Sequence, residues 1–228
     1  MNLAETVHGG YVHHRRVRVL RDHLAELIPQ DARVLDVGCG DGLLASLLRQ
    51  KRPDIDIRGI DVLIRNRTHI PVEPFDGNKI PHGDASLDVA MFVDVLHHAE
   101  DAVALLREGI RVARKAIVIK DHTLNGWLAG PTLRFMDWFG NARYRVTLPY
   151  HYWPRQRWLD VCRHLGLETG VWKTDLKLYP WPANWIFGRS LHFIARLDLA
   201  PNHAGRLPTT FLENIQHKIS EEGLPLRS

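Results

Sequence analysis

The stretch from Val34 to Gly42, VLDVGCGDG, constrains the fold more than any other part of the chain. A short apolar run, typical of a buried strand, is followed by glycines at Gly38, Gly40 and Gly42. Glycines in this arrangement permit a tight turn, a close approach of the backbone to a ligand, and close packing of the next helix on the strand. The stretch therefore predicts a strand, a ligand-binding loop and a helix in direct succession.

The rest of the chain alternates between strand-like and helix-like apolar patterns. Repeated alternation predicts an open sheet with right-handed crossovers, in which ligands bind beyond the carboxyl ends of the central strands. We expect an α/β, Rossmann-like fold with a seven-stranded, mostly parallel sheet, an antiparallel final strand, and helices on both faces. The expected strands are Arg33–Val37, Ile55–Val62, Val72–Phe75, Leu87–Val93, Lys115–His122, Glu168–Tyr179 and Ser190–Leu199, and the expected helices are Tyr11–Ile28, Gly42–Arg52, a stripe from Val103 to Val112, and Pro154–Leu165.

Two segments limit how the sheet is built. Only LIRNRTHI separates the second expected strand from the third, which is too short for a crossover helix, so we expect a single turn or an irregular loop there. The third strand contains Pro74, which lacks the N–H that a central strand needs, so it should lie at the sheet edge. Residues 1–200 should form one domain with an aromatic-rich, lid-like insertion at 123–153, and residues 201–228 a polar tail with one possible helix at 209–220.

Composition favours an ordinary globular protein of a reducing compartment. The chain has 228 residues and only two cysteines, Cys39 and Cys162, without the spacing of a disulfide framework or a zinc site. No apolar segment resembles a signal peptide or a membrane span, so we expect a cytoplasmic protein.

Charge and histidine content give weaker indications. The formal charge of +4 is partly concentrated at Arg15, Arg16, Arg18 and Arg21, which we interpret as the solvated face of an amphipathic helix, with binding to RNA or an anionic lipid surface as the alternative. Histidine pairs such as His97 and His98 should point to opposite sides of a regular element, so no metal site is predicted.

The carboxylates around the glycine loop indicate the charge of the ligand. Asp36 ends the first strand and Asp41 lies inside the loop. A diphosphate placed beside them would be repelled by about 1 kcal/mol per close pair even under water-like screening. A cationic ligand such as S-adenosylmethionine removes this objection, although Asp36 could instead cap the following turn.

These motifs resemble those of class I S-adenosylmethionine-dependent methyltransferases. VLDVGCGDG is similar to the first motif of the family, and GIDV to the second, whose acid, here Asp61, holds the ribose hydroxyls. The segment PFDGNKIPHGDASLDVAMFVDVLHHAED resembles later motifs of the small-molecule branch that includes the ubiquinone-biosynthesis enzymes. The resemblance implies that Asp76 and Gly77 contact the adenine and that Asp94 lies beside the methionine part of the cofactor. The alternative for Asp76 is a turn, because Asp-Gly is itself a strong turn signal.

Residues on the acceptor side should follow the fourth and fifth strands. The candidates there are Asp94, His97, His98, Asp121 and His122, with Tyr150, His151 and Tyr152 reaching in from the insertion. We predict His98 and His122 as the catalytic or substrate-side groups. In each case the alternative is a structural role, such as a buried core histidine or a capping carboxylate.

The sequence limits the class of methyl acceptor without identifying it. The chain lacks the Asn/Asp-Pro-Pro-Tyr segment of amino-methylating DNA and protein enzymes and has DVLH in its place, so no DNA partner is expected. Aromatic segments favour an apolar or aromatic small-molecule acceptor, with oxygen and carbon methylation both open, or else contact with a membrane surface. A nicotinamide-dependent oxidoreductase, a non-catalytic cofactor-binding partner and an RNA-directed enzyme remain alternatives, and the oligomeric state is left open.

Overall fold

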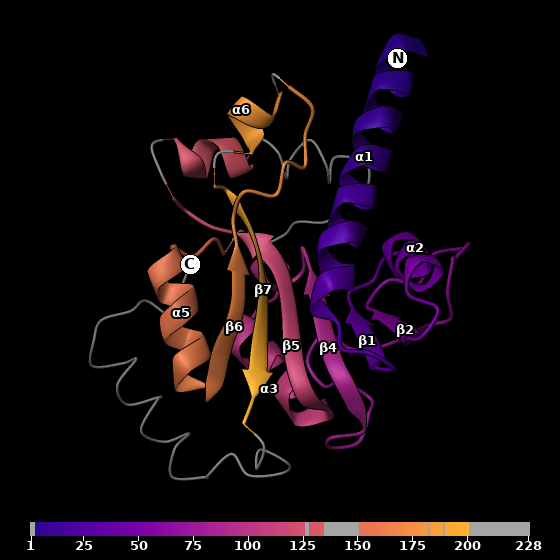
Figure 1. Ribbon diagram of the computed structural model, residues 1–228, viewed down its shortest axis with the longest axis vertical. Helices are drawn as coiled ribbons and strands as arrows, with labels where there is room; N and C mark the ends of the chain where they lie inside the picture. The colour runs from indigo at the N-terminus through magenta and orange to yellow at the C-terminus, as the bar shows by residue number, and fades with distance from the viewer. Residues whose placement is uncertain (1–2, 126–127, 135–150, 182, 189, 201–228) are drawn as a thin grey trace.

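The computed structural model describes residues 3–125, 128–134, 151–181, 183–188 and 190–200. Its centre is a seven-stranded sheet with the order β3-β2-β1-β4-β5-β7-β6 (Figure 1). Only β7 runs antiparallel to its neighbours, β5 and β6, and the other pairings are parallel. The strands are β1 (Arg33–Val37), β2 (Asp56–Asp61), β3 (Val72–Pro74), β4 (Leu87–Val93), β5 (Ala113–His122), β6 (Leu167–Lys173) and β7 (His192–Leu199). The predicted fold class is confirmed.

Helices cover both faces of the sheet, as expected. On one face α1 (Leu3–Leu27) and α2 (Leu43–Lys51) enclose an apolar core, to which Leu24 and Leu48 each contribute a fully buried side chain. On the other face α3 (Ala102–Val112) and α5 (Arg155–His164) pack against the sheet, with Trp158 among the buried side chains. These two cores hold the sheet between the helices and so fix the positions at which the parallel strands end.

Several short elements lie at that carboxyl edge. The 3-10 helix η1 (Leu96–His98) follows β4, and the short helix α6 (Ala183–Phe187) lies beyond the strand ends with the N-terminal half of α1 (Figure 1). Residues 129–134 are also helical. The carboxyl edge is therefore the part of the fold where a ligand site can form.

The strand predictions are correct in their essentials. β1 and β4 have the predicted bounds, β3 lies at the sheet edge as Pro74 requires, and residues 62–71 contain no helix. β6 ends at Lys173, not at Tyr179, because its last ladder partner on β7 is Ile194. The chain beyond it leaves the sheet and turns Leu176 and Leu178 into the core on the α1 side.

The predicted start of the first helix, Tyr11, is wrong. α1 begins at Leu3 and continues through Gly9 and Gly10 to Leu27. A glycine in a helix costs about 1 kcal/mol relative to alanine, which weakens a helix without ending it. Pro154 is the residue before α5, not its first residue.

Part of the sequence interpretation lies outside the described residues. This applies to most of the lid-like insertion, including Tyr150, and to the whole tail from residue 201 with its expected helix. Among the described helices, none combines the length and the apolar character that crossing a membrane requires.

Candidate active site

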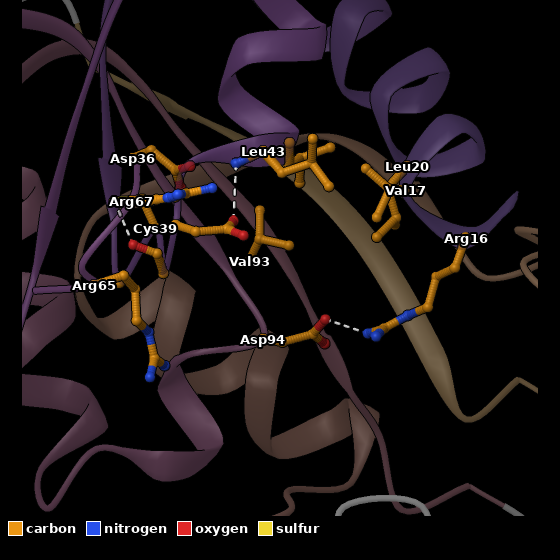
Figure 2. A pocket seen from close by; sticks show the side chains of 14 residues that line it. Arg16, Val17, Leu20, Asp36, Cys39, Leu43, Arg65, Arg67, Val93 and Asp94 are labelled. Atoms are coloured by element: carbon orange, nitrogen blue, oxygen red, sulfur yellow. Dashed lines mark hydrogen bonds and ion pairs between the residues drawn. The ribbon is translucent and has the colours of Figure 1, made fainter. Parts of the chain in front are cut away.

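A cavity of about 440 Å³ opens at the carboxyl edge of β1 and β4. Its walls come from α1, the loop between β1 and α2, the segment after β2, and the end of β4 (Figure 2). This volume lies within the usual range for small-molecule sites. The lining residues are Arg16, Val17, Leu20, Asp36, Gly38, Cys39, Gly40, Asp41, Leu43, Leu44, Arg65, Arg67, Val93 and Asp94.

The glycine loop forms the floor of the cavity for steric reasons. Gly38, Gly40 and Gly42 all have positive φ, at 73°, 62° and 74°. A Cβ on Gly38 would lie 2.5 Å from a methyl group of Val95, whereas a Cβ on Gly40 would meet nothing within 4 Å. The loop thus packs tightly on one side and leaves open space beside Gly40 for a ligand to approach the backbone.

Two predicted cofactor-binding acids lie side by side at this loop. Asp36 is 3% exposed, and burial together with the nearby charge of Asp61 raises its pKa to about 8. The Asp61 carboxylate accepts hydrogen bonds from the N–H groups of Gly40, at 2.7 Å, and Leu63, at 2.8 Å. Without a cationic ligand Asp36 is therefore mostly protonated at neutral pH, and a cation in the cavity would stabilise its ionised form.

Asp94, the third acid, is already neutralised by protein cations. It follows β4 in a left-handed conformation, with φ of 57°. One carboxylate oxygen pairs with the fully buried Lys120 and the other with Arg16, which extends from α1 (Figure 2). Although burial opposes ionisation, Lys120 and Arg16 hold the pKa of Asp94 well below its usual value. Its carboxylate therefore fixes Arg16 at the cavity wall.

A cluster of buried imidazoles continues from Asp94, away from the glycine loop. His122 Nδ1 lies 3.8 Å from Asp94 Oδ1 and 3.4 Å from Asp121 Oδ1. His97 Nδ1 lies 2.6 Å from the same Asp121 oxygen. His97, Asp121 and His122 are at most 4% exposed, and burial followed by the charge of Lys120 lowers the pKa of His122.

The expectation that His97 and His98 point to opposite sides is wrong. They belong to the 3-10 helix η1, and their ring centroids lie 3.8 Å apart. The alternation that separates neighbouring side chains holds for a strand, not for a tight helical turn. The structure also brings His97, Asp121 and His122 within 4.8 Å of one another, a set that could ligate a metal ion and that the sequence did not reveal.

Asp76 and Gly77 do not line the cavity. The Asp76 carboxylate accepts hydrogen bonds from the N–H groups of Asn78 and Lys79, both at 2.8 Å, within its own turn. Gly77 has a φ of 85° in the same turn. The proposed contact of Asp76 and Gly77 with the adenine stays a prediction. The observed hydrogen bonds support the alternative that Asp76 stabilises its own turn.

The cavity is also lined by three arginines, which the sequence analysis did not assign to the site. Arg16 comes from the helix face interpreted as solvated, and Arg65 and Arg67 from the short segment after β2. The shortness of the segment after β2 could have indicated the positions of Arg65 and Arg67, because a short connection keeps both side chains near the end of the strand. The cavity thus presents both carboxylates and guanidinium groups.

Comparison with known proteins identifies the family. A model of a methyltransferase domain matches residues 11–169, and the chain belongs to this family. The 27-O-demethylrifamycin SV methyltransferase of Amycolatopsis mediterranei (strain S699) is 31% identical over 110 residues, which cover 42% of this chain and 40% of that protein. The chain therefore aligns with less than half of the length of this curated relative.

Solved structures agree on the fold. One similar structure is the complex between the Trm112 methyltransferase activator of Haloferax volcanii and a putative methyltransferase. The matched chain superposes with a TM-score of 0.62 at 16% identity, and the match covers 85% of this chain and 95% of that chain. A SAM-dependent methyltransferase from Aquifex aeolicus has a TM-score of 0.55 at 17% identity, covering 78% and 88%. The chain thus has the domain and the fold of the class I S-adenosylmethionine-dependent methyltransferases; its place in the ubiquinone-biosynthesis branch is not confirmed.

The residues of the cavity fit S-adenosylmethionine. The cofactor carries a sulfonium, an ammonium, a carboxylate and an adenosine, and when bound it supplies an electrophilic methyl group on positively charged sulfur. Asp36 offers a buried carboxylate to a cation, and the open side of Gly40 offers backbone contact. The arginines suit the cofactor's carboxylate.

Proposed function

We propose that this methyltransferase acts on a small, apolar or aromatic acceptor, methylating oxygen or carbon. One observation carries the proposal: Asp94 lines the cofactor cavity and also lies 3.8 Å from His122, the nearest of a group of buried imidazole and aromatic rings. Tyr152 packs against this group, with its ring centroid 5.7 Å from His97 and 5.9 Å from His122. The donor site thus adjoins a group of buried rings that carries several polar groups, and we propose that an aromatic acceptor would pack against such rings.

The cofactor contacts follow from the same geometry. Asp36 is proposed to face the positive charge of the methionine part, and Arg16, held by Asp94, to bind its carboxylate. Gly40, whose outer side is open, provides the close backbone approach, while Gly38 and Gly42 let the loop pack against Val95 and Ile70. Asp61, which accepts hydrogen bonds from the N–H groups of Gly40 and Leu63, is proposed to bind the ribose hydroxyls.

On the acceptor side we propose His98 and His122 as polar groups. The backbone of His122 is held in place by Trp158, whose Nε1 donates a hydrogen bond to the His122 carbonyl oxygen at 3.1 Å. Methyl transfer is an in-line displacement, and alignment of the two reactants supplies much of the acceleration. The curated relative is named a 27-O-demethylrifamycin SV methyltransferase, and this name supports an oxygen acceptor on an organic compound over RNA or protein.

Isotopically labelled S-adenosylmethionine, incubated with the protein and a fractionated cell extract, tests this proposal. We expect label in the fraction extractable into organic solvent, where mass spectrometry identifies the product. Asp36→Ala should abolish transfer, whereas Asp56→Asn, an exposed change on β2, should leave it unchanged. Label confined to RNA or protein would show that the acceptor class is wrong.

The competing functions make different predictions. A nicotinamide-dependent enzyme would be stabilised against heat by NAD, whereas we expect stabilisation by S-adenosylhomocysteine alone. An RNA-directed enzyme needs exposed arginines on α1. Arg16 is paired with Asp94 and Arg21 with Asp22, whereas Arg18 is exposed, so salt-dependent binding of RNA tests this alternative. A non-catalytic partner protein would bind the cofactor product without transferring label to any fraction.

Location and surface contacts are proposed on narrower grounds. Both cysteines are free, consistent with the reducing cytoplasm in which we place the protein. Trp181 and Trp185 are 88% and 75% exposed and do not line the cavity, so their proposed partner is a membrane surface, not the acceptor. Co-sedimentation with neutral and anionic vesicles tests this contact, and Trp181→Ser should weaken it.

A further inference from the structure

A buried lysine lies near the end of β5, on the side of the sheet that α1 covers. The alternation of β5 places the Lys120 side chain on the same face as Ala116 and Val118, which belong to the core under α1. Lys120 is 0% exposed and does not line the cofactor cavity. Lysine is almost never fully buried unless it is paired, so its ammonium group requires specific partners.

Lys120 holds Asp94 through two separate contacts. Its backbone carbonyl accepts a hydrogen bond from the Asp94 N–H at 2.9 Å, and its ammonium group pairs with one oxygen of the Asp94 carboxylate. The other oxygen pairs with Arg16, which extends from α1 to the cavity wall (Figure 2). Because the two cations take different oxygens, Lys120 restrains the carboxylate to which Arg16 is bound.

The same ammonium group faces an imidazole with a defined proton position. Lys120 Nζ lies 3.4 Å from Nδ1 of His192, which is 1% exposed at the start of β7. An ammonium group can only donate, so Nδ1 presents its lone pair and Nε2 carries the proton, which it donates to the carbonyl oxygen of Phe187 at 3.1 Å. Burial, followed by the charge of Lys120, holds the pKa of His192 well below its usual value. His192 is therefore a neutral acceptor that holds Lys120 from β7.

The charges in direct contact with Asp94 do not cancel. One carboxylate meets two cations, Lys120 and Arg16, which leaves one positive charge in excess at this end of the cavity. The other buried carboxylate of this region, Asp121, is directed at imidazole groups. The excess charge suits an anionic group, and the methionine part of the cofactor carries one in its carboxylate.

We propose that Lys120 and His192 are positioning residues for the amino-acid part of the cofactor, because they hold Asp94 so that Arg16 faces the cofactor's carboxylate. This inference rests on the contact between Arg16 and that carboxylate in the proposed function, and it deepens that contact. Neither Lys120 nor His192 lines the cavity, so both act through Asp94 and Arg16.

Removal of the ammonium group has a specific consequence. Lys120→Met keeps the length of the side chain and the backbone hydrogen bond to Asp94, but it leaves one carboxylate oxygen without its cation. A guanidinium group binds both oxygens of a carboxylate in parallel, so Arg16 turns onto Asp94 and its charge is compensated there. The excess positive charge is then lost, and the attraction for the cofactor's carboxylate is lost with it.

Two ligands that differ in the amino-acid part measure this effect by calorimetry. S-Adenosylhomocysteine has this part, whereas 5′-methylthioadenosine has the same adenosine and sulfur but ends in a methyl group. Lys120→Met should weaken binding of S-adenosylhomocysteine by about tenfold or more and leave binding of methylthioadenosine within about twofold. A purely structural role of Lys120 would weaken both ligands alike.

Lys115→Met is the matched control. It makes the same change on the same strand, at a lysine whose Nζ lies 2.9 Å from an oxygen of the buried Asp88. Lys115 does not line the cavity, so the ratio of the two affinities should stay at the wild-type value.

His192→Leu provides the test if Lys120→Met does not fold. It removes a neutral side chain and leaves no charge without a partner, and it should weaken S-adenosylhomocysteine alone by about fivefold. His192→Asn, which keeps an acceptor oxygen close to the position of Nδ1, should restore most of this affinity. An unchanged ratio of the two affinities, or an equal loss for both ligands, would overturn the role of the residue that was replaced.

Arg16→Gln separates this inference from the proposed function. If Arg16→Gln weakens S-adenosylhomocysteine while Lys120→Met and His192→Leu do not, Arg16 binds the carboxylate without their help and the inference alone is wrong. If Arg16→Gln leaves this affinity unchanged, the proposed contact itself fails and the inference fails with it. None of these measurements needs the methyl acceptor, so their outcome is independent of the acceptor class.

Discussion

Replacement of the buried Asp36 by asparagine offers the sharpest test of the electrostatics at the glycine loop. Asp36→Asn removes a carboxyl group whose ionisation is opposed by burial and by Asp61. The ordinary pKa is 3.8 and the folded-state pKa about 8. As pH rises, the unfolded chain loses this proton near pH 4, whereas the folded protein without ligand keeps it until about pH 8.

The magnitude follows from this difference. A group whose pKa is raised on folding contributes stability at low pH that is lost as pH rises toward the folded-state pKa. Each pKa unit corresponds to about 1.4 kcal/mol, so the loss for wild type reaches about 4 kcal/mol at pH 7 and at most about 6 kcal/mol above pH 8. Asp36→Asn lacks this loss, and its free energy of unfolding should exceed that of wild type by up to the same amount at pH 7.

Urea unfolding of the ligand-free protein from pH 4 to pH 9 measures the effect, with Asp56→Asn as the control for removal of an exposed carboxylate. Calorimetry supplies the functional counterpart: wild-type affinity for S-adenosylmethionine should increase with pH up to about 8, and Asp36→Asn should bind at least tenfold more weakly. Wild-type and Asp36→Asn stabilities that run parallel across the whole pH range would refute the reasoning.

Three further substitutions test other parts of the structure. Gly38→Ala, which adds a Cβ 2.5 Å from a neighbouring methyl group at a φ of 73°, should cost about 1–3 kcal/mol of stability and weaken binding of S-adenosylhomocysteine, whereas Gly83→Ala, where the nearest atom is 4.0 Å away, should do neither. Lys120→Met, which removes a fully buried cation, should lower the free energy of urea unfolding by about 3–5 kcal/mol, and an unchanged value would show that this ion pair is dispensable. Asp101→Ala, which removes a side chain accepting two backbone N–H groups at the start of α3, should cost about 1 kcal/mol in thermal or urea unfolding while affinity for S-adenosylhomocysteine is unaffected; a loss of affinity would contradict a purely capping role.

The sequence by itself determined the sheet and the position of the loop. Apolar runs such as Leu87–Val93 are buried on both faces, and the lack of an N–H on Pro74 confined β3 to the edge. The glycines of the loop were equally informative, because the positive φ values found there are conformations that glycine adopts without strain. Such properties belong to single residues or short windows, and for this reason a linear pattern reveals them.

Only the tertiary structure decided how the polar side chains pair. Asp94 was expected to contact the cofactor directly. Instead, its two carboxylate oxygens pair with Lys120, which lies 26 residues after it in the sequence, and with Arg16, which lies 78 residues before it. His97 and Asp121 come from different elements, and nothing in their local sequence indicates that they meet at 2.6 Å. Burial, pairing and the resulting protonation states depend on contacts between segments distant in sequence, and these exist only once the chain has folded.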